Sequence, residues 1–166
     1  WEAQAADEFS RTEGGFSRFN FDVNHVSKLS KVTQFDIFAH GQLANRNLDS
    51  SEQFYLGGAD AVRAYPQGEA GGDSGYQATA ELRYQTPVKG MSMTLFADVG
   101  EVLARKDGDT SDPHRRLAGW GIGAVYSLDR SLYARLDYAR KIKGESYRSE
   151  AEDKNGRLWF RLYKLF

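Results

Sequence analysis

Cysteine is absent from this sequence of 166 residues, and proline occurs only three times. Without cysteine the chain has no disulfide scaffold, no catalytic thiol and no cysteine-based zinc site. Charge of neither sign is in large excess, because 22 lysines and arginines are balanced by 23 aspartates and glutamates. Nucleic-acid-binding proteins normally carry a basic surplus, so we expect no nucleic-acid partner. No apolar run approaches the roughly 20 residues of a membrane-spanning helix. The length fits one domain, or a piece of a larger one.

Glycine and aromatic residues are frequent, and apolar and polar residues alternate along six segments. This alternation is typical of strands with one apolar side and one water-facing side. A seventh segment, at the end of the sequence, carries apolar residues on both sides. The pattern predicts an all-β, antiparallel fold with about seven strands, near residues 19–24, 34–43, 76–85, 91–100, 119–128, 132–141 and 158–166. Such a set would close into a small barrel only with an eighth strand from Trp1–Phe9 or by forming an oligomer.

The connections between these strands alternate in length. They are short near residues 30–31, 87–90 and 129–130, and long over about 44–75, 104–116 and 143–156. In an up-and-down sheet this order places every short turn at one end and every long loop at the other. Transmembrane β-barrels of the outer membrane show the same asymmetry, with short periplasmic turns and longer outer loops.

The alternation of apolar and polar residues does not show which side of the sheet faces inward. A small ligand-binding barrel of the lipocalin type turns its apolar side inward, whereas a transmembrane barrel turns it outward to lipid. Charged residues at mid-strand favour the transmembrane barrel, because a water-filled lumen accommodates them; they are Asp22, Glu81, Arg83, Asp98, Arg135 and Asp137.

A polar, glycine-rich loop at about 45–75 is too long for a simple hairpin tip, and loops of that length are usually functional or disordered. Such a loop can fold into the lumen and be anchored there by Arg63, whose guanidinium can form a bidentate pair with the lumen-facing Asp98. Glycines on the wall would leave room for the loop; they are Gly100, Gly119, Gly121 and Gly123. The alternative is a cross-strand pair between Asp98 and Arg83, with Arg63 in solvent.

No enzymatic or cofactor site is predicted. The three histidines, His25, His40 and His114, are scattered over two strands and a loop, so we expect no metal site. The glycines at 119, 121 and 123 lie within a strand and precede no helix, which argues against a nucleotide-binding loop. No nucleophile-elbow motif accompanies the serines.

Five short motifs resemble those of one protein family. Leu56-Gly57-Gly58 is followed by the tetrad Val62-Arg63-Ala64-Tyr65, by Gly72-Asp73-Ser74-Gly75 and by Glu81-Leu82-Arg83, and one strand later comes Phe96-Ala97-Asp98-Val99-Gly100. Their order and spacing resemble the two-partner secretion (TpsB) outer-membrane transporters, which export haemolysins and filamentous haemagglutinin and lie within the BamA-like barrel superfamily. The resemblance covers about Phe16 to Phe166, and Ala64 departs from the usual glycine.

The resemblance implies that residues 1–166 are the C-terminal portion of a sixteen-stranded barrel in the bacterial outer membrane. It implies export of a secreted exoprotein through the lumen, with outer-membrane lipids and the barrel assembly machinery as further partners. The alternative within the superfamily is a barrel that inserts other outer-membrane proteins. Phe160, Leu162 and Phe166 resemble the C-terminal signal by which such barrels are recognised for assembly.

Overall fold

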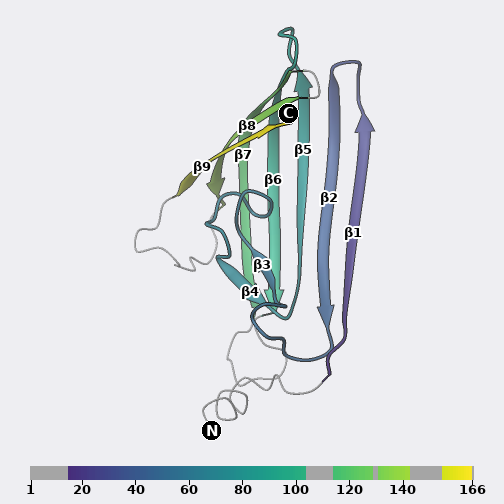
Figure 1. Cartoon of the computed structure of the whole chain (residues 1–166), viewed down its shortest axis with the longest axis vertical. Coiled ribbons are helices and arrows are strands. Elements are labelled where there is room, and N and C mark those ends of the chain that lie inside the picture. Colours follow the sequence, from purple (N-terminus) through teal and green to yellow (C-terminus); the bar gives the residue numbers. More distant parts are fainter. Residues whose placement is uncertain (1–14, 104–113, 129–130, 143–154, 166) are drawn as a thin grey trace.

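The computed structural model describes residues 15–103, 114–128, 131–142 and 155–165. Seven long strands form one antiparallel sheet in the order β1-β2-β5-β6-β7-β8-β9 (Figure 1). Their bounds are β1 (Arg18–Lys28), β2 (Thr33–Ala44), β5 (Ser74–Gln85), β6 (Met91–Leu103), β7 (His114–Leu128), β8 (Leu132–Lys141) and β9 (Gly156–Lys164). The all-β fold, the seven strands and the up-and-down order are confirmed. Within the described ranges no helix is long and apolar enough to cross a membrane.

The sheet remains open, with β1 and β9 as its edges. The strands are longer than the alternation indicated: β1 continues to Lys28, and β7 begins at His114 rather than near residue 119. The proposed eighth strand at Trp1–Phe9 lies outside the described residues.

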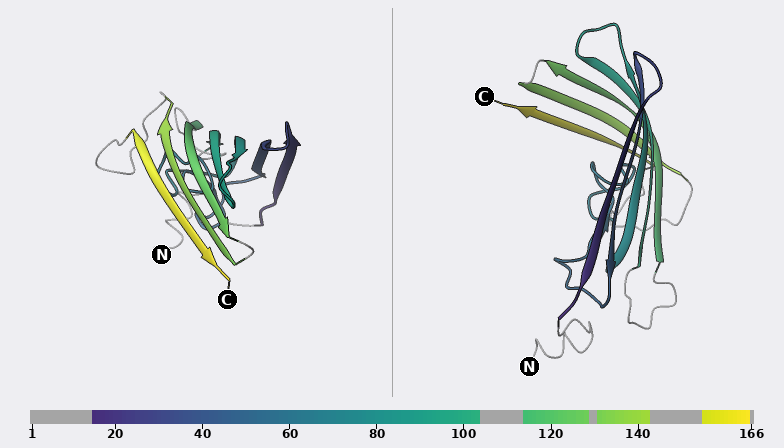
Figure 2. Two further views of the ribbon diagram at one scale, coloured as in Figure 1. Left: turned by 90° about the horizontal axis from the view of Figure 1, so that it is seen from above. Right: turned by 90° about the vertical axis from the view of Figure 1, so that its right-hand side faces the viewer.

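The connection between β2 and β5 contains a second, two-stranded sheet that the alternation did not predict. Its strands are β3 (Phe54–Leu56) and β4 (Ala70–Gly72), which pair antiparallel with Phe54 opposite Gly72. Strands of three residues are too short to produce a recognisable alternation. Figure 2 shows the main sheet curving, with the β2–β5 connection on its concave side.

The two faces of the sheet differ in chemistry. Residues on the concave face of β6 are buried while their neighbours on the convex face are exposed, in strict alternation. The convex face carries a continuous set of exposed apolar side chains that includes Met93, Leu95, Val99, Trp120, Ile122, Leu136, Tyr138, Leu158, Phe160 and Leu162. The apolar face therefore points outward, which is the reverse of a lipocalin-type barrel. The ambiguous last strand follows the same rule, because Trp159 and Arg161 lie on the opposite, less exposed side.

The buried core lies between the β2–β5 connection and the concave face. The connection contributes Phe54, Leu56, Val62, Ala64, Tyr65 and Ala70, and the sheet contributes Phe96, Val102, Leu117 and Ala139. This packing holds the loop against the barrel wall and positions the charged residues described next.

Candidate functional site

Arg63 and Asp98 join the loop to the wall. The Arg63 guanidinium donates from Nη2 to Asp98 Oδ1 at 2.7 Å and from Nε to Asp98 Oδ2 at 2.9 Å, which is a bidentate pair. The main-chain N–H of Arg63 also donates to Oδ2, at 3.1 Å. Both residues are buried, Arg63 with 4% of its surface exposed and Asp98 with none. The structure thus brings together the two residues that the sequence analysis considered as an anchor.

Strand β6 places Asp98 for this contact. Asp98 lies opposite Thr79 of β5, whose hydroxyl donates to Oδ1 at 2.9 Å. The carboxylate therefore accepts four hydrogen bonds, which is the full capacity of its two oxygens. The cross-strand pair between Asp98 and Arg83 does not form; Arg83 instead contacts Glu81 at 3.0 Å and Asp36 at 3.9 Å.

The other two positions of the Phe-x-Asp-x-Gly motif also contact the loop. The guanidinium carbon of Arg63 lies 3.3 Å from the centroid of the Phe96 ring, a cation–π contact between two buried side chains. Gly100 faces Leu56, and a Cβ on Gly100 would lie 2.6 Å from Leu56 Cδ2. The motif thus supplies a stacking ring, a carboxylate and a space for the loop.

A second layer of charges surrounds the pair. Arg63 Nη1 lies 3.4 Å from Glu81 Oε2 and 3.7 Å from Asp137 Oδ1. Arg135 bridges the same two carboxylates, with Nη2 donating to Glu81 at 2.6 Å and Nε donating to Asp137 at 2.7 Å. The predicted lumen-facing residues Glu81, Arg83, Arg135 and Asp137 therefore belong to one network with the loop arginine.

Charge in this network is closely balanced. Two buried arginines, Arg63 and Arg135, face three buried carboxylates, Glu81, Asp98 and Asp137. The partly exposed Arg83 and Arg161 add positive charge at the rim, and Arg161 Nη2 lies 3.6 Å from Asp137 Oδ2. Buried charges are costly unless each is paired, so loss of one member leaves its partners uncompensated.

The first part of the loop turns through two glycines. Gly57 and Gly58 have φ of 85° and 116°, which side chains rarely adopt, and the main-chain N–H of Gly58 donates to Tyr65 O at 3.1 Å. Val62 and Tyr65 are buried beneath this turn, and the Tyr65 ring receives Lys141 Nζ at 4.9 Å from its centroid. The hydrogen bond between Gly58 and Tyr65 therefore joins the two ends of the segment that carries Arg63.

Ala64, the one departure from the family pattern, fits against a glycine of the wall. A Cβ on Gly119 would lie only 2.6 Å from the Cβ of Ala64. The methyl group of Ala64, which is 1% exposed, therefore occupies space that any side chain at position 119 would need.

The Gly72-Asp73-Ser74-Gly75 stretch fixes the end of the loop. Asp73 is fully buried; its N–H donates to Leu103 O at 2.9 Å, and its Oδ1 accepts from the Leu48 N–H and from Gln53 Nε2. Gly72 abuts the main chain at Leu103, and a Cβ on Gly75 would lie 2.7 Å from the Glu101 carbonyl. These contacts join both ends of the loop to the start of β5 and the end of β6.

Strand β9 contributes two contacts that the sequence reasoning missed. Trp159 Nε1 donates to the main-chain carbonyl of Arg63 at 2.7 Å, and Arg161 forms an ion pair with Asp60 of the loop. One feature of the sequence could have indicated these contacts. In the last segment Trp159 and Arg161, which can donate hydrogen bonds, alternate with the apolar residues Leu158, Phe160 and Leu162. This alternation was hard to recognise because aromatic and apolar residues occupy both faces of the last segment.

The remaining candidates lie away from this network. Phe160 and Leu162 are exposed on the convex face, and Phe166 lies outside the described residues. His40 bonds Asp22 at 2.6 Å, and His114 bonds Glu101 at 2.8 Å. Across the part of the chain that the structure describes, no group of three histidine, aspartate or glutamate side chains could hold a metal ion.

Comparisons with known proteins agree with the motifs. The sequence model of the family described as haemolysin secretion/activation protein ShlB/FhaC/HecB matches residues 1–126. The chain is similar to the heme/hemopexin transporter protein HuxB of Haemophilus influenzae strain 86-028NP, with 33% identity over 98 residues, which are 57% of this chain and 17% of that protein. HuxB of strain KW20 is 32% identical over 100 residues, covering 58% of this chain and 18% of that protein.

A solved structure has the same fold. CdiB from Acinetobacter baumannii superposes with a TM-score of 0.64 at 23% identity, over 90% of this chain and 26% of the CdiB chain. This chain thus spans 17–18% of the length of the two HuxB relatives and about a quarter of CdiB.

Proposed function

The chain belongs to the ShlB/FhaC/HecB family of haemolysin secretion/activation proteins, and we propose that the protein containing it exports a partner exoprotein across the bacterial outer membrane. In this proposal residues 1–166 are the C-terminal portion of a larger barrel, whose remaining strands continue the sheet beyond its open edges. The exported polypeptide passes through the lumen that the concave face lines.

The chemistry of the two faces supports this proposal. Exposed apolar side chains on the convex face suit the hydrocarbon of a bilayer, and charged side chains on the concave face suit a water-filled lumen. Outer-membrane barrels keep their short turns in the periplasm, which places the β1–β2 and β5–β6 turns there and the β2–β5 loop toward the cell surface. Phe160, Leu162 and Phe166 would then present the signal read by the barrel assembly machinery.

One observation carries the mechanism: a buried, bidentate pair joins the loop to the concave face of the sheet. Because Arg63 and Asp98 are both buried, separating them would leave each charge without its closest partner, which is energetically costly. The loop is therefore held in one position, and we propose that this position keeps the lumen in its secretion-competent shape. Arg135 and Glu81 extend the same restraint to β8 and β5.

Export by variants at the anchor tests the proposal. In a host that produces the exoprotein, Arg63→Ala and Asp98→Asn should each reduce the amount of exoprotein secreted at equal barrel abundance in the outer membrane. Arg116→Ala is the matched control, because Arg116 is an arginine on the exposed surface. Undiminished export in both anchor variants would refute the proposal.

Porin levels measured in the same cultures distinguish a secretion function from a membrane-protein insertion function. If the barrel inserts other outer-membrane proteins instead, the anchor variants should lower porin levels in the outer membrane. The proposed function predicts unchanged porins alongside reduced exoprotein.

A further inference from the structure

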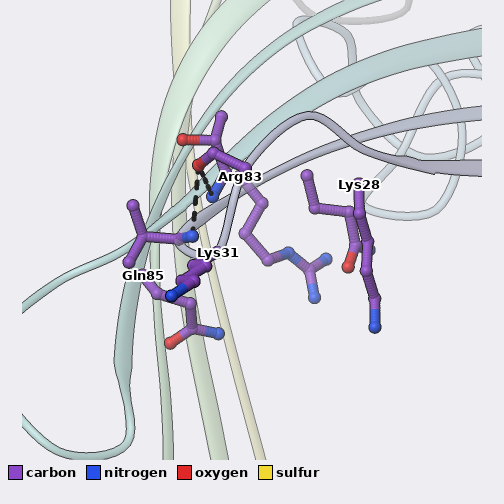
Figure 3. A pocket seen from close by; sticks show the side chains of 8 residues that line it. Lys28, Lys31, Arg83 and Gln85 are labelled. Carbon is purple, nitrogen blue, oxygen red and sulfur yellow. Dashed lines mark hydrogen bonds between the residues drawn. The ribbon is translucent and has the colours of Figure 1, made fainter.

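A second polar site lies at the short-turn end of the sheet, away from the loop anchor. The β1–β2 turn and the end of β5 enclose a pocket of about 510 Å³ there, lined among others by Lys28, Lys31, Arg83, Gln34 and Gln85 (Figure 3). Three of the lining residues are cations and none is a carboxylate. Arg83 is partly neutralised by Glu81 and Asp36, so the positive charge of the pocket comes mainly from Lys28 and Lys31.

The strand register places this charge on the lumen side. Lys28 lies opposite Gln34 on β2, and Gln34 lies opposite Arg83 on β5, so the three side chains form one row across the sheet. Arg83 shares its face with Glu81, two residues earlier on the same strand, which is buried against the loop network. The pocket thus opens on the concave face, opposite the apolar face that we assign to lipid.

The cationic side chains of the pocket are not all paired with other residues. Among the residues that the structure describes, the ammonium groups of Lys28 and Lys31 have no hydrogen-bonding or ion-pair partner. Arg83 is partly used, because its Nη2 lies 3.0 Å from Glu81 Oε1 and 3.9 Å from Asp36 Oδ2. Two lysines without a partner, beside a guanidinium that is about one third exposed, form a site suited to an anionic group.

The turn that carries Lys31 is held in place. Ser30 Oγ accepts hydrogen bonds from the N–H groups of Val32 and Thr33, at 3.2 and 3.0 Å (Figure 3). The N–H of Gln85 donates to Val32 O at 2.8 Å and ties β5 to the same turn. The main chain that carries Lys31 is therefore fixed before any ligand binds, which lowers the entropy cost of binding.

We infer that this pocket binds acidic side chains of the exported polypeptide as it enters the lumen from the periplasm. The inference rests on the proposed function, which supplies the periplasmic position of the short turns. A guanidinium and two ammonium groups recognise carboxylates and phosphates, and a carboxylate is the anion that a polypeptide in the lumen supplies. Lipid phosphate is the less suitable occupant, because the convex face is the one turned to lipid. Complementary charge would also speed capture of the chain.

Peptide binding to the full-length protein in neutral detergent tests this site. The probe is a fluorescein-labelled peptide of alternating glutamate and serine, and its partner has glutamine in place of glutamate. The double variant Lys28→Gln/Lys31→Gln should weaken binding of the acidic peptide roughly tenfold, and about 0.5 M salt should weaken binding to the unchanged protein similarly. Lys89→Gln, in the β5–β6 turn at the same end but outside the pocket, should bind normally.

Three results would overturn the inference. They are unchanged affinity in the double variant, equal binding of the glutamine peptide, and displacement of the acidic peptide by glycerol phosphate at lower concentration than by free glutamate. The last result would assign the pocket to phosphate. The peptide-binding measurement does not depend on export, so its result is independent of the anchor variants. Normal export by the anchor variants would refute the proposed function, but it would not change the binding result.

Discussion

Trp159 donates its indole N–H to the main-chain carbonyl of Arg63, 96 residues earlier in the sequence, at 2.7 Å. The last strand of the sheet therefore contacts the same residue that β6 holds through Asp98. Arg63 is fixed by its side chain on one strand and by its main chain on another. This arrangement makes the loop position depend on strands that are not neighbours in the sheet.

Trp159→Phe should loosen the loop without disturbing the strand. The ring is kept, but the Arg63 carbonyl loses its donor, which costs about 1 kcal/mol. We expect faster protease cleavage within residues 45–73 in detergent-solubilised protein. Trp120→Phe is the matched control, because Trp120 is exposed on the convex face. Equal cleavage rates for the two variants would contradict the contact.

Arg63 and Asp98 should show strong coupling in a double-mutant cycle. Arg63→Ala and Asp98→Ala should each lower the free energy of unfolding by roughly 3–5 kcal/mol, because each removes the closest partner of a buried charge. The double variant should lose clearly less than the sum, since it removes both charges. Urea unfolding in micelles, followed by circular dichroism, measures all four proteins. Additive losses would mean that the two side chains stabilise the protein independently.

Much of this site could be predicted from residue alternation. The period-two pattern placed Phe96, Asp98 and Gly100 on the polar face, and the structure places all three against the loop. The network of Arg63 with Glu81 and Asp137 could not be predicted in the same way, because those residues lie on strands that do not pair with each other.

The missed elements have a common cause. The hairpin of β3 and β4 is too short for a period to appear, and in β9 aromatic and apolar residues occupy both faces. In each case the position is decided by contacts with distant residues, such as Trp159 with Arg63, rather than by the local pattern.

Arg63→Lys should impair the anchor although it keeps the charge. Lysine cannot form the bidentate pair, and its ammonium group lacks the planar surface that lies over Phe96. We expect a loss of about 2 kcal/mol in unfolding free energy, from charge-assisted hydrogen bonds that are not replaced. Exoprotein secretion should fall, but less than in Arg63→Ala. Wild-type stability and export in Arg63→Lys would show that charge alone is sufficient.

Gly119 and Ala64 should compensate for each other. In Gly119→Ala the new Cβ would lie 2.6 Å from the Cβ of Ala64 and 3.2 Å from the Arg140 carbonyl, so the loop must shift away from the wall. Overpacking of this kind costs roughly 1–3 kcal/mol. Gly15→Ala is the neutral control, because nothing lies within 4 Å of the added carbon.

A second substitution, at Ala64, tests whether the defect of Gly119→Ala comes from this clash or from any side chain at position 119 of β7. Ala64→Gly removes the methyl group that the new Cβ meets, so the double variant Ala64→Gly/Gly119→Ala should regain most of the lost stability and export. Only the contact with the Arg140 carbonyl would remain, and at 3.2 Å it requires a shift of a few tenths of an ångström. If the double variant is as defective as Gly119→Ala, the loop is not positioned by contact between these two residues. Recovery would show that alanine at 64 is accommodated because position 119 is glycine.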